Sequence, residues 1–309
     1  MPSVGIVGAT GAVGRVAIPL LKERGHDDVR LFASGRSAGA EIDGTLVEEA
    51  TPETLGAGGL DVVLFAIGTA ASRELVPHAV SGGATVVDKS SAYRLQDGVP
   101  LVVPEVNGDR ALEHDGIVAN PNCCSIPLSC VLKPLHDAAG VRRVRVATYQ
   151  AASGAGTGAM ERLRATATDD TDLAMDWDFD GEEFDEEAKI RDETRKILEL
   201  PALPVHAQCM RVPVMVGHAE AVWVETEEAF SPEDARRLLD EAPSVRLVDF
   251  PTPKQAQGID DVLVGRIRRD STEQNGLSLL VVCDNLRKGA ALNAIQIAEL
   301  LLERQRVAA

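Results

Sequence analysis

A glycine-rich turn near the start of the chain constrains the fold more than any other feature. Residues 4–14 read VGIVGATGAVG, and an apolar helical pattern follows them. Glycines at this spacing, between a strand and a helix, let the backbone approach a pyrophosphate that the helix N–H groups can bind. A glycine-rich turn without a ligand is the alternative. We expect a dinucleotide site around Gly8 and Gly11.

The segment after the next predicted strand, 29–33, indicates which nicotinamide cofactor binds. NAD sites usually place an acidic residue at the end of this strand, to bond the ribose 2′-hydroxyl. Here the strand is followed by SGRSAG, and no acid occurs until Glu41. A guanidinium with two hydroxyls suits a 2′-phosphate, so Arg36 predicts NADP. An ordinary surface arginine is the alternative.

Alternating elements predict the fold class. Apolar strands at 61–67 and 85–88 enclose a helix at 73–81, which is typical of a doubly wound parallel sheet, here a Rossmann-like α/β domain. Residues 141–285 have too much alternating strand pattern to continue that sheet, so we expect a separate α+β domain with a mixed or antiparallel sheet. A final helix from Ala290 to about Arg304 should return to the first domain. The expected domains are 1–122 completed by 286–309, for cofactor binding, and 123–285, for catalysis and dimerisation.

Cys123 is the candidate nucleophile. It lies in NPNCCSIP, residues 120–127, ahead of an apolar helical pattern that Gly140 ends. Because proline is tolerated only in the first turn of a helix, Pro127 predicts a helix that begins near Cys124 or Ser125. Unpaired N–H groups and the helix dipole then favour a thiolate at Cys123. Asn122 can cap this helix and donate to the oxygen of a bound carbonyl. A small buried hydrophobe is the alternative.

Other polar residues leave two interpretations open. His218, one of six histidines, lies in an apolar strand pattern beside a glycine turn, where a neutral imidazole can act as a base or be a satisfied core residue. Arg94 is an anion clamp or a surface residue. Glu193 and Lys196 share a helix face, which by default makes an exposed pair of little consequence.

Charge and cysteine content exclude several classes of protein. The net charge of −17 argues against binding to nucleic acid or to an anionic membrane. Residues 169–193 alone carry a net charge of −11, as a solvated acidic segment would. Five cysteines do not make a disulfide framework, the apolar runs are strand-sized, and no signal peptide is evident. We expect a cytoplasmic protein with reduced thiols, no membrane span and no metal.

With these residues in view, the sequence resembles the bacterial aspartate-semialdehyde dehydrogenase family over nearly its whole length. The matching motifs are GATGAVG at 8–14, SGRSAG at 34–39, SSAYR at 90–94, NPNC at 120–123, TYQAASGAG at 148–156, ETRKIL at 193–198, RVPVMVGHAEAV at 211–222 and DNLRKGAALNAIQIAE at 284–299. Where the family usually has Ser and Thr after the nucleophile, this chain has Cys124 and Ser125. Neither departure removes a predicted catalytic residue.

The resemblance implies a role for each site residue. Cys123 would form the acyl thioester, His218 would be its acid–base partner, and Gln150 would orient the substrate or intermediate. Arg211 would hold the α-carboxylate, with Glu193 at the amino group, and Arg94, Lys196 and Asn122 would bind phosphate. The residues implied at NADP are Gly8, Thr10, Gly11, Ala12, Val13, Arg36, Ser37, Ser153, Gly154 and Asn285.

The implied activity is the reversible, phosphate-dependent conversion of L-4-aspartyl phosphate to L-aspartate 4-semialdehyde, by a homodimer or homotetramer in lysine, threonine and methionine biosynthesis. These roles fit the chemistry, since a thiolate, a hydride acceptor and a cationic pocket are what the conversion of an aldehyde to an acyl phosphate requires. Two alternatives remain: an N-acetyl-glutamyl-phosphate reductase, or an inactive NADP-binding scaffold.

Overall fold

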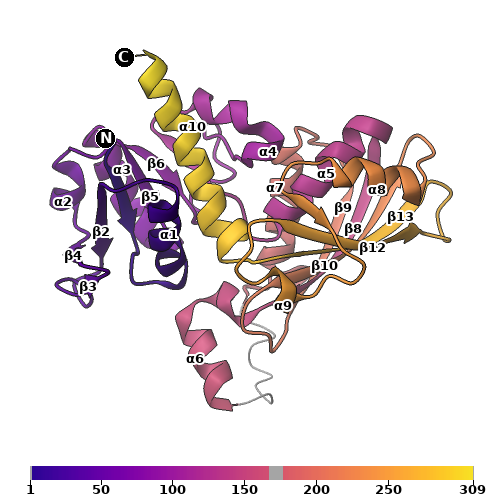
Figure 1. Ribbon diagram of the computed structural model, residues 1–309, viewed down its shortest axis with the longest axis horizontal. Coiled ribbons are helices and arrows are strands. Elements are labelled where there is room, and N and C mark those ends of the chain that lie inside the picture. Colours follow the sequence, from indigo (N-terminus) through magenta and orange to yellow (C-terminus); the bar gives the residue numbers. More distant parts are fainter. Residues whose placement is uncertain (1, 167–176, 309) are drawn as a thin grey trace. The chain divides into compact units, whose positions relative to one another are not determined.

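The computed structural model describes residues 2–166 and 177–308, and the chain divides into two compact units (Figure 1). Unit 1 comprises Met1–Pro121 and Ala290–Ala309, and unit 2 comprises Asn122–Gly289. The last helix, Leu292–Ala308, belongs to unit 1 together with the first part of the chain. The expected boundaries at 122/123 and 285/286 remain a prediction about independent domains.

Unit 1 is built from alternating strands and helices, as the sequence predicts. Its elements are β1 (Val4–Val7), α1 (Ala12–Glu23), β2 (Val29–Ala33), β3 (Glu41–Ile42), β4 (Thr45–Glu49), α2 (Pro52–Gly56), β5 (Val62–Phe65), α3 (Thr69–Ser81), β6 (Thr85–Asp88), α4 (Pro104–Asn107), a 3₁₀ turn (Gly108–Glu113), β7 (Ile117–Ala119) and α10 (Leu292–Ala308).

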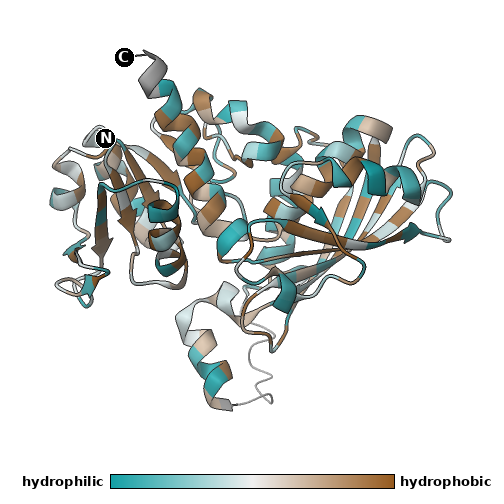
Figure 2. Ribbon diagram, viewed as in Figure 1, coloured by the Kyte–Doolittle hydropathy of each residue, from teal (hydrophilic) through white to brown (hydrophobic). Residues whose placement is uncertain are grey.

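The strand order of unit 1 places the glycine-rich turn where such sheets bind ligands. The order is β3-β4-β2-β1-β5-β6-β7, and all neighbours are parallel except β3 and β4. Because the chain leaves β1 first toward β2 and later, on the other side, toward β5, β1 lies at the topological switch point. The fully buried, apolar strands β1 and β5 are those expected of a sheet covered on both faces (Figure 2).

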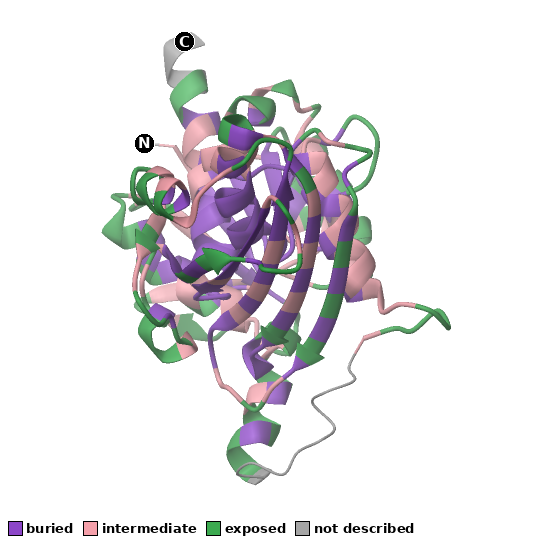
Figure 3. Ribbon diagram, turned by 90° about the vertical axis from the view of Figure 1, so that its right-hand side faces the viewer, coloured by how far each residue is buried: buried purple, intermediate pink, exposed green. Residues whose placement is uncertain are grey.

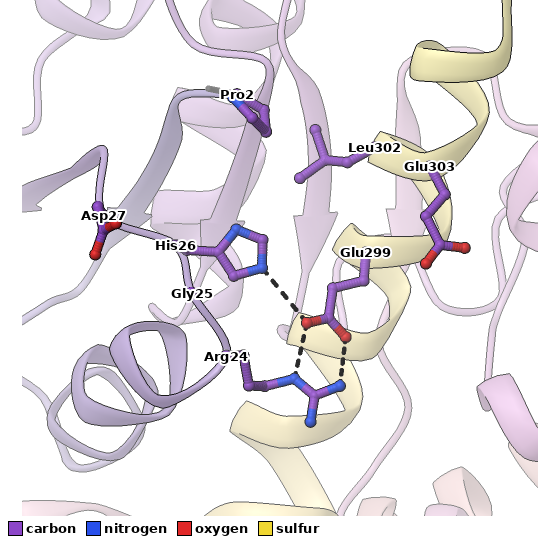
Figure 4. A pocket seen from close by; sticks show the side chains of 8 residues that line it. All are labelled: Pro2, Arg24, Gly25, His26, Asp27, Glu299, Leu302 and Glu303. Carbon is purple, nitrogen blue, oxygen red and sulfur yellow. Dashed lines mark hydrogen bonds and ion pairs between the residues drawn. The ribbon is translucent and has the colours of Figure 1, made fainter.

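The C-terminal helix α10 is fixed to the rest of unit 1. Ile295 and Ala298 are buried in one core cluster with Ile6 of β1 and Leu21 of α1. At the rim of this core, Glu299 accepts hydrogen bonds from Nε and Nη2 of Arg24, at 2.8 and 2.6 Å. His26 also points toward Glu299, with Nε2 at 3.4 Å (Figure 4). These residues line a surface cavity of about 280 Å³ that contains none of the predicted site residues.

Unit 2 combines one sheet with helices on one of its faces. Its elements are α5 (Ser125–Ala139), β8 (Val141–Gln150), a 3₁₀ turn (Ala152–Ala155), α6 (Thr157–Thr166), α7 (Asp185–Ile197), β9 (Val205–Arg211), β10 (His218–Thr226), α8 (Pro232–Asp240), β11 (Val245–Leu247), α9 (Pro253–Ala256), β12 (Val262–Arg269) and β13 (Gly276–Cys283). A π-helical turn, Arg287–Ala291, leads into α10.

The sheet of unit 2 is mixed, with the order β11-β12-β13-β10-β8-β9. Its central pairs are antiparallel, whereas β8 with β9 and β11 with β12 are parallel. Helices α5, α7 and α8 pack on the sheet. Along β8 and β9, buried residues alternate with more exposed ones (Figure 3). The predicted fold class, a Rossmann-like domain with a mixed-sheet α+β domain, is therefore confirmed.

Element boundaries differ from the expected ones by a few residues. The helix expected at 73–81 begins earlier, at Thr69, and the strand expected at 61–67 is shorter, Val62–Phe65. Residues 169–176 of the acidic segment lie outside the described residues, whereas 185–193 belong to α7. Within the described residues, no helix is both long and apolar enough to cross a membrane.

Candidate active site

The glycine-rich turn of unit 1 fits a pyrophosphate. Gly8 has φ +93°, and a Cβ atom on Gly14 would lie 2.3 Å from the carbonyl oxygen of Gly8. Glycine is therefore required at both positions. Helix α1 begins directly after Gly11, which provides no side-chain cap, so the N–H groups of its first turn can serve an anionic ligand.

Two arginines of unit 1 lie at the carboxyl ends of its strands. Arg36 is exposed in the turn after β2, beside half-buried Ser37. Arg94 is 7% exposed, so its interpretation as a surface residue is wrong. Its guanidinium donates to the carbonyl oxygens of Asn120, at 3.0 Å, and Lys89, at 2.5 Å. Arg94 thus fastens the polar loop after β6 to the end of β7.

Strand register in unit 2 brings three predicted residues into one row. Gln150, the last residue of β8, pairs with Arg211, the last residue of β9. On the other side of β8, Ala219 pairs with Tyr149, so His218 lies beside the end of β8. All three side chains are at least 95% buried and point to the face on which α5 lies. Arg211 and His218, which follow Gln150 by 61 and 68 positions in the sequence, are therefore its neighbours in the sheet.

Cys123 lies at the start of α5, as predicted, because the helix begins at Ser125 and ends before Gly140. The Sγ atoms of Cys123 and Cys124 and a ring nitrogen of His218 all lie within 4.8 Å of one another. All five cysteines are among the described residues, and Cys123 alone is not buried. Burial raises the pKa of the Cys124 thiol well above its ordinary value, so Cys124 stays a neutral thiol.

Asn122 is held by two carboxylates of α7. Its Oδ1 accepts from the N–H of Cys124 at 2.8 Å; because Cys124 is the N-cap residue and α5 has no side-chain cap, the predicted capping of the helix by Asn122 is wrong. Its Nδ2, expected to serve a bound oxygen, donates to Glu186 at 2.9 Å, and its backbone N–H donates to Glu193 at 2.6 Å. Glu193 is 1% exposed, so the expectation of an exposed pair with half-buried Lys196 is wrong. Glu193 thus holds the backbone of the residue before Cys123, and Glu186 holds its side chain.

His218 presents a hydrogen-bond donor to the site. The N–H of Ala151 donates to its Nδ1 at 3.0 Å, so the lone pair of the neutral ring lies on Nδ1 and the proton on Nε2. Nε2 is buried, and no group among the described residues forms a hydrogen bond with it. The sequence predicts an acid–base residue at His218, and this arrangement provides an N–H that can stabilise negative charge on sulfur or oxygen.

The loop after β8 closes the row of side chains. A Cβ atom on Gly154 would lie 2.8 Å from Nη1 of Arg211 and 3.1 Å from Nε2 of His218. Nη1 of Arg211 also donates to the carbonyl oxygen of Ala151 at 3.1 Å and contacts Oε1 of Gln150 at 3.4 Å. The absence of a side chain at Gly154 is thus what leaves room for both functional groups.

Asn285 ties this loop to the turn before His218. Its Nδ2 donates to Oγ of Ser153 at 2.9 Å, and its Oδ1 accepts from the N–H of Gly217 at 2.8 Å. The sequence predicts that Ser153 and Asn285 bind the cofactor. The contacts within unit 2 give them a role in shaping the loop, and their contact with NADP remains a prediction.

Glu220 is a buried carboxyl that sequence analysis missed. It is 1% exposed, and within residues 2–166 and 177–308 no N–H or O–H group donates to either carboxylate oxygen. Burial raises the pKa of this carboxyl well above its ordinary value; nearby Cys123 raises it further, and contact with Cys124 opposes the rise. The spacing of two from His218 on one strand is the signal that could have found it.

Protonation of Glu220 predicts how stability depends on pH. Above the unfolded pKa of 4.5, the unfolded chain loses this proton while the folded chain keeps it, so folding becomes less favourable as pH rises. A neutral amide has no such cost. We therefore expect the free energy of unfolding of Glu220→Gln, relative to that of the unmodified protein, to increase between pH 5 and pH 7.5. The increase should be up to about 1.4 kcal/mol per pH unit. Urea unfolding at both pH values measures it, with exposed Glu228→Gln as the control, and a gain of equal size at both would contradict it.

Comparison with known proteins agrees with this architecture. The family model of the semialdehyde dehydrogenase NAD-binding domain matches residues 3–114, and that of the semialdehyde dehydrogenase dimerisation domain matches 132–288. The fold and the site thus define an oxidoreductase with an NAD-binding domain and a dimerisation domain. Cys123 lies between the two matched ranges.

Relatives along the whole chain specify the family further. Aspartate-semialdehyde dehydrogenase of Corynebacterium melassecola is 45% identical, over 98% of this chain and all of the relative. The solved structure of aspartate semialdehyde dehydrogenase II from Vibrio cholerae, complexed with ASA, is 38% identical with a TM-score of 0.92 and covers 98% of both chains. The Candida albicans enzyme, solved with NADP, is 28% identical with a TM-score of 0.76, covering 97% of this chain and 98% of that one. The chain belongs to the aspartate-semialdehyde dehydrogenase family.

Proposed function

We propose that this protein interconverts L-4-aspartyl phosphate and L-aspartate 4-semialdehyde, with NADP and inorganic phosphate, through a thioester on Cys123. The observation that carries the proposal is the position of Cys123. It is the cysteine that is not buried, it lies at the start of α5, and His218 is within 4.8 Å. Nucleophile and oxyanion donor are thereby paired.

Cys123 and His218 carry the steps in which the C–S bond forms and breaks. In the reductive direction the thiolate forms a C–S bond to the acyl carbon while the C–O bond to phosphate breaks, and its electron pair leaves with phosphate. Negative charge would develop on the acyl oxygen when the thioester carbon accepts a hydride from bound NADPH, and it would return to sulfur when the C–S bond breaks and the aldehyde carbonyl forms. The N–H at Nε2 of His218 stabilises this charge in both places without having to remove a proton.

The substrate is held by the row of residues at the ends of β8 and β9. We assign its α-carboxylate to Arg211, its amino group to Glu193 and orientation of its acyl group to Gln150. Arg94, Lys196 and Asn122 remain the predicted phosphate residues. Because the positive charges of Arg94, Lys196 and Arg211 act locally, a protein with a negative net charge can still bind an anionic substrate.

Bound NADP would supply or accept the hydride. The residues of unit 1 that fit it are the glycines after β1 and the N-terminus of α1 for the pyrophosphate, and Arg36 with Ser37 for the 2′-phosphate. Ser153, Gly154 and Asn285 remain predicted to complete the site.

Arg36 provides a test of cofactor choice. We expect Arg36→Asp to raise the KM for NADP by roughly 10- to 100-fold, because a carboxylate repels the 2′-phosphate and loses a charged hydrogen bond. The KM for NAD should change far less, since a carboxylate accepts from a free 2′-hydroxyl. Steady-state kinetics with both cofactors decide; equal changes would refute the assignment.

The function is tested by NADP reduction with two substrates side by side. Purified protein is given L-aspartate semialdehyde or N-acetyl-glutamate semialdehyde, with and without phosphate. We expect turnover of the first alone, and only with phosphate. Turnover of the second would make the protein an N-acetyl-glutamyl-phosphate reductase, and binding of NADP without turnover of either would make it a scaffold.

We also propose that the protein is a cytoplasmic homodimer or homotetramer. Unit 2 carries the dimerisation domain of the family. Tyr149 and Met210, which pair across β8 and β9, are 40% and 53% exposed, as expected of a sheet face that another copy covers. The five free cysteines suit a reducing compartment. Light scattering of the purified protein measures the oligomeric state.

A further inference from the structure

Residues 177–184, which we call the aromatic turn, fold into a compact unit within the acidic segment. Phe179 and Phe184 form an isolated antiparallel bridge, with ring centroids 5.2 Å apart, and Trp177 lies 6.0 Å from the Phe184 ring. Inside the turn, Oδ1 of Asp180 accepts from the N–H groups of Glu182 and Glu183, both at 2.9 Å. A segment that reads as solvated from its charge is therefore ordered around three rings.

The aromatic turn is anchored to the strand that ends in Arg211. Glu187 in the first turn of α7 accepts from the N–H of Phe184 at 2.9 Å through one oxygen. Through its other oxygen it accepts from the N–H of Cys209 in β9 at 2.8 Å. One carboxylate thus connects the aromatic turn to β9, two residues before Arg211.

This anchoring places an aromatic face over the side chain assigned to the substrate carboxylate. The guanidinium carbon of Arg211 lies 4.5 Å from the centroid of the Trp177 ring, at cation–π distance. Arg211 is 5% exposed, and its Nη1 is held by the carbonyl oxygen of Ala151. Stacking on the indole restrains the plane of the guanidinium, which is the plane in which a carboxylate pairs with it.

We propose that Trp177 is a positioning residue that orients Arg211, and that it thereby sets the requirement for an α-carboxylate on the substrate. The inference rests on the proposed function of Arg211. A planar bidentate pair with a carboxylate needs a fixed guanidinium plane, and an indole face also excludes water from one side of it. A ring that served the fold alone would affect all substrates equally.

Substrate pairs and variants of the aromatic turn test the proposal. The matched substrate is 3-aminopropanal, which is L-aspartate semialdehyde with hydrogen in place of the carboxylate. We expect Trp177→Leu to raise the KM for L-aspartate semialdehyde by about 5- to 30-fold, with kcat nearly unchanged and the KM for 3-aminopropanal unaltered. Trp177→Phe should recover much of the loss. Glu182→Gln, at an exposed position of the same turn outside its three rings, is the control and should behave as the unmodified protein.

A binding measurement separates failure of this inference from failure of the proposed function. The chain contains two tryptophans, so Trp223→Phe leaves Trp177 as the sole indole fluorophore. Its fluorescence should change on titration with L-homoserine, which keeps the α-carboxylate, and stay constant with 3-amino-1-propanol, which lacks it. Parallel KM changes for both aldehydes, or equal fluorescence responses to both alcohols, would overturn the inference. If the protein turned over no aldehyde, the proposed function would fail and the titration alone would decide the role of Trp177.

Discussion

Cys123→Ser should reduce phosphate-dependent turnover of L-aspartate semialdehyde by at least about 10³-fold, because a serine hydroxyl without a dedicated base is a poor nucleophile. Cofactor binding should be unchanged, since the glycine-rich turn belongs to unit 1. Steady-state kinetics and NADP titration measure the two effects separately.

Cys124→Ser is the matched control for this loss. The Cys124 side chain is fully buried against Glu220, which can accept a hydroxyl hydrogen bond as it now contacts the thiol. The account therefore predicts a folded and active variant. If Cys124→Ser lost turnover and Cys123→Ser kept it, the nucleophile would have been assigned to the wrong one of two adjacent thiols.

His218→Ala should lower kcat by about 10²- to 10³-fold, the usual effect of removing one oxyanion donor. His218→Gln should retain about ten times more activity than His218→Ala, because its amide can donate a hydrogen bond. This difference tests the tautomer that Ala151 imposes, in which Nε2 carries the proton. A general base at this position predicts equal losses, since neither substitution supplies one, and equal losses would contradict the donor role.

Local signals in the sequence were sufficient to predict the fold and the position of Cys123 at the start of α5. Pro127 and Gly140 delimit α5 through rules that depend on neighbouring residues only, so the position of Cys123 could be predicted. The glycine spacing after β1 is also a local signal, because it predicts the geometry of the turn that these glycines themselves form. Resemblance to a family then supplied roles that spacing alone left open.

Contacts distant in the sequence could not be predicted from such signals. Asn122 meets Glu186 across 64 positions and Glu193 across 71, and the default reading of Glu193 as an exposed residue failed because helix periodicity does not reveal which face a tertiary neighbour covers. Glu220 was missed for a related reason, since burial follows from α5 packing on β10. The contact of Trp177 with Arg211 was not predicted, because the net charge of residues 169–193 indicates a solvated segment.

The acyl-enzyme is the most direct test of the central claim, that Cys123 carries the substrate. Protein mixed with NADP and L-aspartate semialdehyde without phosphate should release about one NADPH per chain in a burst. Peptide mass mapping should then find the acyl group on Cys123, and added phosphate should discharge it. Steady turnover without phosphate, or an acyl group on any other residue, would contradict the account.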